Sequence, residues 1–413
     1  MKFRYDFHTS ILWNPEMKKR CRGWLLSLAA ICFGVMLILG YQALKDSIPD
    51  EIQITEDNDR ELTEIFSNPL ITWEDSIPVY GGKKYTISCK LLDMVFLKTV
   101  HVEVVEHRWV EVSGNAVGIY METKGILIVD TEKIKGEDGI YYEPAENLVR
   151  PGDYITAFDQ KKISTKRELI EAIENCDGNQ VQLSLMRDGK EVFLSVNPVR
   201  CGAGDYKLGI WVRDDTQGIG TLTYVEQDGD FGALGHGISD VDTGNLLQIK
   251  DGTLYETEIL GINKGSKGNP GELSGLIRYD DSRVLGEIQS NTENGIFGNI
   301  AYAKKLTLQK REVGYKQDMK TGPATVLCAV DGTVDEYNIE ITEIDMNHKD
   351  SNKSFTLKVT DERLLEKTGG IVQGMSGSPV LQNGKFVGAI THVFVQDSTG
   401  GYGIFAETML AHD

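Results

Sequence analysis

The sequence predicts a mostly β protein that follows one N-terminal transmembrane helix. Residues 23–44 carry no charged side chain, and a helix of that length crosses the ~30 Å hydrocarbon core of a bilayer. Beyond residue 80, short apolar stretches with alternating polarity recur between turn signals, as in barrels and sandwiches. The 44 glycines suit a chain with many tight turns better than a helical protein.

Length and charge limit the classes of protein that this chain can be. Its 413 residues are enough for two or three compact domains. The net charge of -19 repels phosphate backbones, so nucleic acid is not an expected partner. The cysteines form no CxxC pair, which argues against a zinc ribbon or a redox motif. Whether the last four of them pair is left open by the sequence: Cys89, Cys176, Cys201 and Cys328.

The charges around the apolar segment predict its orientation. Four basic residues lie between Lys18 and Arg22, and the acidic Asp46, Asp50 and Glu51 follow the segment. The positive-inside bias therefore predicts a cytoplasmic N-terminus at 1–22, a signal anchor at 23–44, and all later residues outside the cytoplasmic membrane. A cleaved signal peptide is the alternative. The segment is long for one, and bulky Tyr41 stands where a cleavage site needs a small residue.

Residues 45–104 are expected to be a tether and a β-rich linker. The first part, 45–80, is polar and acidic with three prolines, which is typical of an extended spacer. In the second part, His101, Glu103 and His107 would share one face of a strand, because faces alternate with period two. A solvated polar face explains them more simply than a metal site, and we expect no metal.

Residues 105–200 carry the pattern of a small α/β module. The apolar run 125–129 predicts a buried strand, and an Arg-Pro-Gly-Asp turn at 150–153 leads into another. Thr165 with Glu168 forms a capping box before a helix whose apolar stripe includes Leu169. Asp188-Gly189 predicts a hairpin. Together these features resemble a bacterial PDZ domain.

The PDZ resemblance implies a peptide-binding groove. In such domains a peptide adds as a strand between a strand and the helix. We expect the groove to lie beside Gly118, Ile119 and Tyr120 and against the helix near Leu169. The alternative is that these residues are simply part of the core.

Residues 201–413 read as a β-rich domain with one candidate nucleophile. An Asn-Gly turn at 383–384 joins two apolar strands. Just before it, Ser376 lies between glycines, which suits a sharp turn that exposes a hydroxyl. The backbone N–H groups of Gly374 and Ser376 would then bind a substrate oxyanion. Ser378 is the rival serine, although Pro379 after it favours the start of a strand.

A serine nucleophile needs a general base and a group that orients it. His236 is the best base because a glycine flanks it on each side, and His392 is its competitor. Asp361 is the candidate acid, although it also suits the N-cap of a short helix that begins at Glu362. Four other carboxylates stay open for that role: Asp240, Asp242, Asp280 and Asp281.

The PDZ-like module, GALGHGISD and TGGIVQGMSGSP together resemble the SpoIVB peptidase family of sporulation signalling serine proteases. The resemblance runs from the membrane anchor to the C-terminus. It implies a trypsin-like double β-barrel and a triad of His236, Asp361 and Ser376. It also implies action between the two membranes around the forespore, on a regulator of an intramembrane metalloprotease complex, which releases a late sigma factor. The sequence departs from standard trypsin-like enzymes in one respect. Asp361 lies only 15 residues before Ser376, whereas those enzymes usually place the acid much further upstream.

The sequence therefore predicts a membrane-anchored serine endopeptidase that needs no metal or organic cofactor. Its expected partners are a protein substrate, the membrane, and its own tether or another copy through the PDZ-like module, with self-cleavage inside 45–80. A base of ordinary histidine pKa, raised somewhat by an aspartate, predicts activity that climbs through roughly pH 6–8. The alternative is a non-catalytic adaptor that binds peptides through the PDZ-like module and a protease-like barrel.

Overall fold

The computed structural model describes residues 15–55, 66, 68–75, 83–347 and 351–411. The chain divides into two compact units, Met1–Val105 and Glu106–Asp413. Parts of the predicted tether (56–65, 67 and 76–82) and residues 1–14 of the predicted cytoplasmic segment lie outside the described residues.

The first unit begins with the apolar helix that the sequence predicts. Helix α1 spans Pro15–Asp46, and an 18-residue window within its part Lys19–Asp46 has a mean hydropathy of 2.2. Its apolar side chains are exposed; Trp24, for example, is 77% exposed. The helix is long and apolar enough to cross a membrane, which is consistent with a single-pass anchor.

A four-stranded sheet follows α1 in the first unit, in the order β1-β4-β3-β2. Its strands are β1 (Glu51–Thr55), β2 (Ile71–Asp75), β3 (Lys84–Leu91) and β4 (Val95–Val105). The side chains of Ile52, Ile87 and Val100 fill its core. Two stretches of the predicted tether are therefore strands of this sheet, because their alternate apolar side chains have a core to enter.

The three residues considered for a metal site do not share a strand. Strand β4 ends at Val105, before His107, whose Nδ1 lies 2.6 Å from Glu312 Oε1. Glu103 forms an ion pair with Lys84 at 3.0 Å. Among the described residues, no group of three histidine, cysteine or acidic side chains is arranged to hold a metal ion, and all six cysteines are free thiols.

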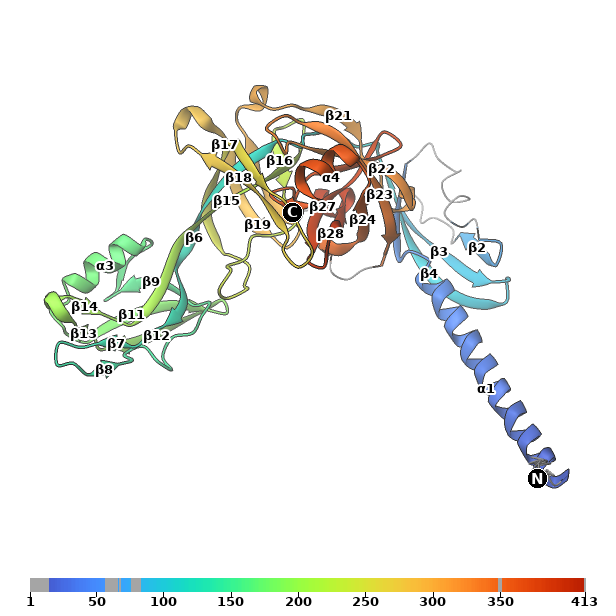
Figure 1. The fold of residues 1–413 in the computed structure, drawn as a ribbon, viewed down its shortest axis with the longest axis horizontal. Coiled ribbons are helices and arrows are strands. Elements are labelled where there is room, and N and C mark those ends of the chain that lie inside the picture. The colour runs from blue at the N-terminus through green and yellow to red at the C-terminus, as the bar shows by residue number, and fades with distance from the viewer. Residues whose placement is uncertain (1–14, 56–65, 67, 76–82, 348–350, 412–413) are drawn as a thin grey trace, which may run out of the picture. The chain divides into compact units, whose positions relative to one another are not determined.

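The second unit contains two β-barrels (Figure 1). In the first, six strands follow one another in the order β6-β15-β16-β20-β19-β17, and pairing between β17 and β6 closes the ring. These strands are β6 (Ala116–Thr131), β15 (Ile210–Val225), β16 (Asp230–Ala233), β17 (Ile249–Asn263), β19 (Val284–Thr292) and β20 (Gly295–Ile300). Two shorter strands, β5 (Trp109–Val112) and β21 (Gln309–Glu312), pair beside β15.

The predicted α/β module extends from two strands of this barrel. The second half of β6 pairs with β9 (Tyr154–Phe158). Strand β9 also pairs with β11 (Val181–Arg187), and β11 pairs with β12 (Lys190–Val196). Helix α3 (Lys166–Glu174) has the predicted capping box of Thr165 and Glu168, and β11 and β12 form the predicted hairpin. Five two-residue strands complete the described part of the module: β7 (Ile134–Lys135), β8 (Tyr141–Tyr142), β10 (Lys161–Lys162), β13 (Val199–Arg200) and β14 (Tyr206–Lys207).

This insertion changes how the chain is divided. We expected a PDZ domain at 105–200 and a peptidase domain at 201–413, but β5 and the first half of β6 pair into the first barrel. Strands β6 and β15 are each 16 residues long and pair along most of their length. They are therefore shared between the module and the barrel, because a strand longer than the barrel can continue its ladder into a second sheet.

The second barrel closes in the order β22-β23-β24-β28-β27-β26. Its strands are β22 (Gly322–Cys328), β23 (Asp335–Ile344), β24 (Phe355–Val359), β26 (Pro379–Gln382), β27 (Lys385–Phe394) and β28 (Asp397–Phe405). The predicted Asn-Gly turn joins β26 to β27, with φ of 53° at Asn383 and 80° at Gly384. Two positive φ values are what a tight two-residue hairpin requires, and they explain the choice of residues. Helix α5 (Ala406–Leu410) ends the described chain.

Candidate active site

Ser376 lies in a tight turn between β25 (Val372–Gln373) and β26 of the second barrel. Gly374 and Gly377 on either side of it have φ of 100° and 93°. A Cβ atom added to Gly377 would lie 2.2 Å from the carbonyl oxygen of Thr221, so only glycine fits there. The predicted sharp turn at the serine is present, and it is set by contact with a strand of the other barrel.

The hydroxyl and backbone of Ser376 are available for chemistry. Its Oγ donates a hydrogen bond to the carbonyl oxygen of Thr391 at 2.7 Å. Within the described ranges, the backbone N–H groups of Gly374 and Ser376 have no acceptor, so their oxyanion role stays a prediction. Ser378 is fully buried, and its Oγ has no partner among the described residues.

His236 lies in the loop after β16 of the first barrel. The loop turns through Leu234 and Gly235, whose φ values are 69° and 68°. A Cβ on Gly237 would lie 2.3 Å from the carbonyl oxygen of Thr292. The glycines beside His236 therefore allow the loop to pack closely against its neighbours.

The hydrogen bond of His236 favours the tautomer that a general base needs. Its Nδ1 lies 2.8 Å from the carbonyl oxygen of Gly237. A carbonyl oxygen only accepts, so Nδ1 carries the proton and Nε2 is left as an acceptor. Burial lowers the pKa of His236 below its usual value, and the carbonyl of Gly237 opposes this only in part. The sequence had led us to expect a raised pKa.

A second histidine lies against the first. The rings of His236 and His392 have centroids 4.8 Å apart and planes tilted by 33°. His392 is on β27, directly after Thr391, and its buried Nδ1 has no partner among the described residues. Burial first, and then the neighbouring His236 and Lys353, lower the pKa of His392 to about 4. At neutral pH His392 is therefore an uncharged ring packed against the candidate base.

One cleft of about 450 Å³ is lined by both histidines and by Ser376. Its walls are formed by four segments, 216–219, 234–238, 371–376 and 391–395, together with Ile119 and Pro270. The structure thus brings together two of the three predicted triad residues, one from each barrel. Asp361, the third, does not line this cleft.

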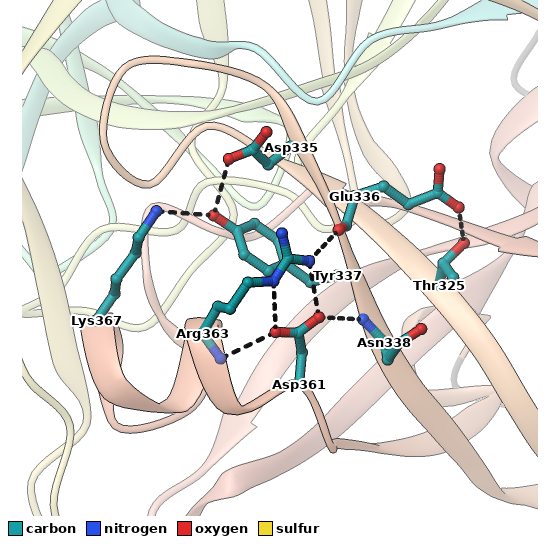
Figure 2. A network of polar contacts seen from close by, with 8 residues as sticks. All are labelled: Thr325, Asp335, Glu336, Tyr337, Asn338, Asp361, Arg363 and Lys367. Atoms are coloured by element: carbon teal, nitrogen blue, oxygen red, sulfur yellow. Dashed lines mark hydrogen bonds and ion pairs between the residues drawn. The ribbon is translucent and has the colours of Figure 1, made fainter.

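Asp361 instead caps the short helix α4 (Glu362–Thr368), as Figure 2 shows. Its Oδ1 accepts from the backbone N–H of Arg363 at 3.0 Å and from Arg363 Nε at 3.1 Å. Its Oδ2 accepts from Arg363 Nη2 at 2.9 Å and from the N–H of Asn338 at 3.1 Å. The Arg363 guanidinium holds the pKa of Asp361 at about 2. Its role as the orienting acid stays a prediction.

The other candidate acids are also held elsewhere. Asp240 is buried and forms an ion pair with Arg213, which also contacts Asp242. Asp280 caps the short 3-10 helix Asp281–Arg283. In the part of the chain that the structure describes, no carboxylate lies within ion-pair distance of His236.

Asn291 on β19 is a positioning residue that the sequence did not reveal. Its Oδ1 accepts from the N–H of Ile238, and its Nδ2 donates to the carbonyl oxygens of Ile238 and Leu247, all within 2.8–2.9 Å. These bonds fix the chain just after His236. No motif marks such a residue, because its partners are 44 and 53 residues away along the chain.

Of the four residues that we expected at the groove beside α3, only Leu169 lines it. The groove has a volume of about 460 Å³ and is lined by Leu169 and Ile170 of α3 and, opposite them, by residues 205–212, including Trp211. Leu169 is thus at the groove, but Gly118, Ile119 and Tyr120 lie in the first half of β6, between β15 and β17. Ile119 lines the cleft of His236 and Ser376 instead. A pattern of alternating residues could not show which half of so long a strand faces α3.

Comparison with known families gives two matches. The profile of the family described as SpoIVB peptidase S55 matches residues 204–410, which is 207 of the 413 residues. The profile of the PDZ domain matches residues 121–197. The second match covers the module that extends from β6 and β15, and the first covers most of both barrels.

Solved structures with similarity to parts of the chain include two bacterial PDZ domains and one protease. The PDZ domains of the SdrC-like proteins of Listeria monocytogenes and Listeria innocua are each 20% identical. They cover 21% and 22% of this chain and 86% and 94% of theirs, with TM-scores of 0.17 and 0.18. The active form of the Rv3671c protease from M. tuberculosis is 15% identical over 47% of this chain and 72% of its own, with a TM-score of 0.25.

Proposed function

Because the chain belongs to the SpoIVB peptidase family, we propose that it is a membrane-anchored serine endopeptidase with Ser376 as nucleophile and His236 as general base. The observation that carries this proposal is the shared cleft, which is lined by both His236 of the first barrel and Ser376 of the second. A nucleophile and a base far apart in sequence but adjacent in one cleft are the arrangement that acyl transfer needs.

The proposed reaction follows from the hydrogen bonds of the two residues. Ser376 Oγ turns from the carbonyl of Thr391 toward Nε2 of His236 and attacks the scissile carbonyl as Nε2 takes its proton. The free N–H groups of Gly374 and Ser376 stabilise the oxyanion, and His236 then gives its proton to the leaving amine. The orienting role that the resemblance gives to Asp361 is part of the proposal.

Labelling with a fluorophosphonate tests the nucleophile directly. We expect the probe to label the full-length protein at Ser376, and to fail with Ser376→Ala and with His236→Ala, because both are needed for an activated hydroxyl. Ser378→Ala is the matched control: it removes a buried hydroxyl two residues away and should label normally. A folded wild-type protein that no probe labels would favour the adaptor alternative.

We further propose that the substrate is a regulator of an intramembrane metalloprotease complex, cleaved in the space between the forespore membranes so that a late sigma factor is released. Family membership and the apolar helix α1 support this role. The charges around α1 favour a catalytic domain outside the cytoplasm. External protease should therefore digest residues 45–413 in spheroplasts, and protection of the whole chain would exclude this topology.

Self-cleavage within residues 45–80 is the remaining part of the proposal. The acidic, proline-containing sequence of that stretch outside β1 and β2 supports it, because such sequences favour the extended form in which a peptide enters a protease cleft. Purified wild-type protein should shorten with time, whereas Ser376→Ala should not. Shortening of pure Ser376→Ala protein would show that another activity is responsible.

A further inference from the structure

The catalytic cleft has a lining that differs from the rest of this protein. A quarter of all residues are charged, and the net charge is -19. A second cavity in the same unit, lined by residues of β17, β18 (Gly271–Ile277) and nearby loops, holds Glu256, Glu258, Arg278, Arg283 and Asp331. None of the described residues that line the catalytic cleft is an aspartate, glutamate, lysine or arginine.

The apolar part of the cleft lies beside the nucleophile. Ile371 and Val372 precede Ser376 in the same segment, and both are almost fully buried in the core of the second barrel. Val393 and Val395 follow Thr391, whose carbonyl oxygen accepts the Ser376 hydroxyl at 2.7 Å. Two apolar walls, one of Ile371 with Val372 and one of Val393 with Val395, therefore line the same cleft as the serine.

The surrounding fold holds most of these two walls in place. Val372 pairs with Gly271 of β18, the N–H of Ile371 donates to the carbonyl oxygen of Ser398 at 2.7 Å, and Val393 packs against the same core. Ile371, Val372 and Val393 are thus packed into or against the barrel core, while Val395 is 54% exposed. Packed side chains keep their shape when a ligand enters, so they select by size and polarity.

We propose that these two walls bind the side chain of the substrate residue that contributes the scissile carbonyl, and that this residue is apolar and of the size of leucine or phenylalanine. The inference rests on the proposed endopeptidase function. A charged side chain in this space would lose its water without gaining an ion-pair partner, whereas an apolar one gains contact area. We expect kcat/KM to favour apolar residues over charged ones by on the order of 10²-fold.

A peptide library digested by the full-length protein in detergent tests the inference. Cleavage positions are read by mass spectrometry, and only cuts absent from a parallel Ser376→Ala digest are counted. We expect leucine, isoleucine, valine, methionine and phenylalanine to be enriched before the cut, and lysine, arginine, aspartate and glutamate to be depleted. Ser376-dependent cuts without that enrichment overturn the inference but leave the endopeptidase function standing. A complete lack of Ser376-dependent cuts overturns both.

A charge placed in one wall provides a second test. In Val393→Asp the carboxylate would lie in the cleft, and cuts after lysine and arginine should rise at least tenfold relative to cuts after leucine. Val241→Asp, on a side chain that is 85% exposed and outside the cleft, is the matched control and should keep the wild-type preference. Fluorophosphonate labelling of Ser376 reports whether the variant site is intact. A labelled Val393→Asp protein with unchanged preference would contradict the proposal, and if that variant does not label, the wild-type library alone decides.

Discussion

The cleft around His236 and the cap of α4 around Asp361 are both built on buried polar groups, yet they are satisfied to very different degrees. Asp361 accepts four hydrogen bonds, and an adjacent guanidinium holds its pKa at about 2. In the cleft, His236 makes one hydrogen bond to its own neighbour, and His392 has a buried nitrogen with no partner among the described residues. Saturated groups stabilise a fold, whereas poorly satisfied ones remain able to exchange protons with a substrate.

The largest effect is expected for the two residues that share the cleft. Ser376→Ala and His236→Ala should each reduce kcat/KM on the order of 10⁴-fold or more, because neither residue is effective without the other. The double variant should be little worse than either single one. Steady-state kinetics on the three variants measures this, and additive losses would show that the two residues do not act as a unit.

Substitution of Asp361 separates the two regions most directly. If Asp361 orients His236 in the working enzyme, Asp361→Asn should lower kcat/KM about 10⁴-fold. If the carboxylate only caps α4, the rate should stay near that of the wild type, since asparagine caps about as well. Arg363→Gln is the matched control, because it removes the ion pair and leaves the carboxylate in place. The rates should be measured on samples shown by circular dichroism to be folded.

The pH dependence of activity tests how His236 is held. Its pKa is lowered by burial, so the neutral form that accepts a proton persists to lower pH than for a free histidine. The acidic limb of kcat/KM should therefore have its midpoint below about 6.5. A midpoint above 7 would mean that the protonated form of His236 is stabilised in the working enzyme. It would indicate that a carboxylate contacts His236 there.

The pKa of Asp361 predicts a smaller effect on stability in acid. A folded pKa below the unfolded value gives stability that is present above about pH 4 and is lost as pH falls through about 2. The contribution should be about 1–2 kcal/mol, since Arg363 is largely exposed and screened. Thermal melting of wild type and Asp361→Asn between pH 2 and 6 measures it, and parallel melting curves across that range would contradict the assigned ion pair.

The smallest expected effect is on peptide recognition at the groove beside α3. Trp211 is 57% exposed and lines that groove, so Trp211→Ala should weaken binding of a peptide ligand about tenfold and leave cleavage of short peptides unchanged. Ile119 offers the contrast, because it is buried at the cleft of His236 and Ser376, and Ile119→Ala should affect cleavage itself. Equal loss of cleavage in both variants would show that the two sites are not separable.

The sequence determined the local features of this protein. The apolar segment predicted α1, the capping box predicted the start of α3, and the two tight turns predicted their hairpins. Each of these depends on residues within a few positions of one another, so the pattern along the chain contains the full physical cause. The glycines around Ser376 and His236 belong to the same class, since they marked two unusual turns before any contact was known.

The tertiary structure decided which distant residues lie in contact. It made β6 and β15 common to two domains, placed Ile119 at the cleft of His236 and Ser376 rather than at the expected peptide groove, and placed His392 against His236. It also joined Asp361 to Arg363 and Asn338 rather than to a histidine. These outcomes depend on strand register and on contacts between residues far apart in the chain. Alternating polarity is the same for both halves of a long strand, so the sequence alone could not distinguish them.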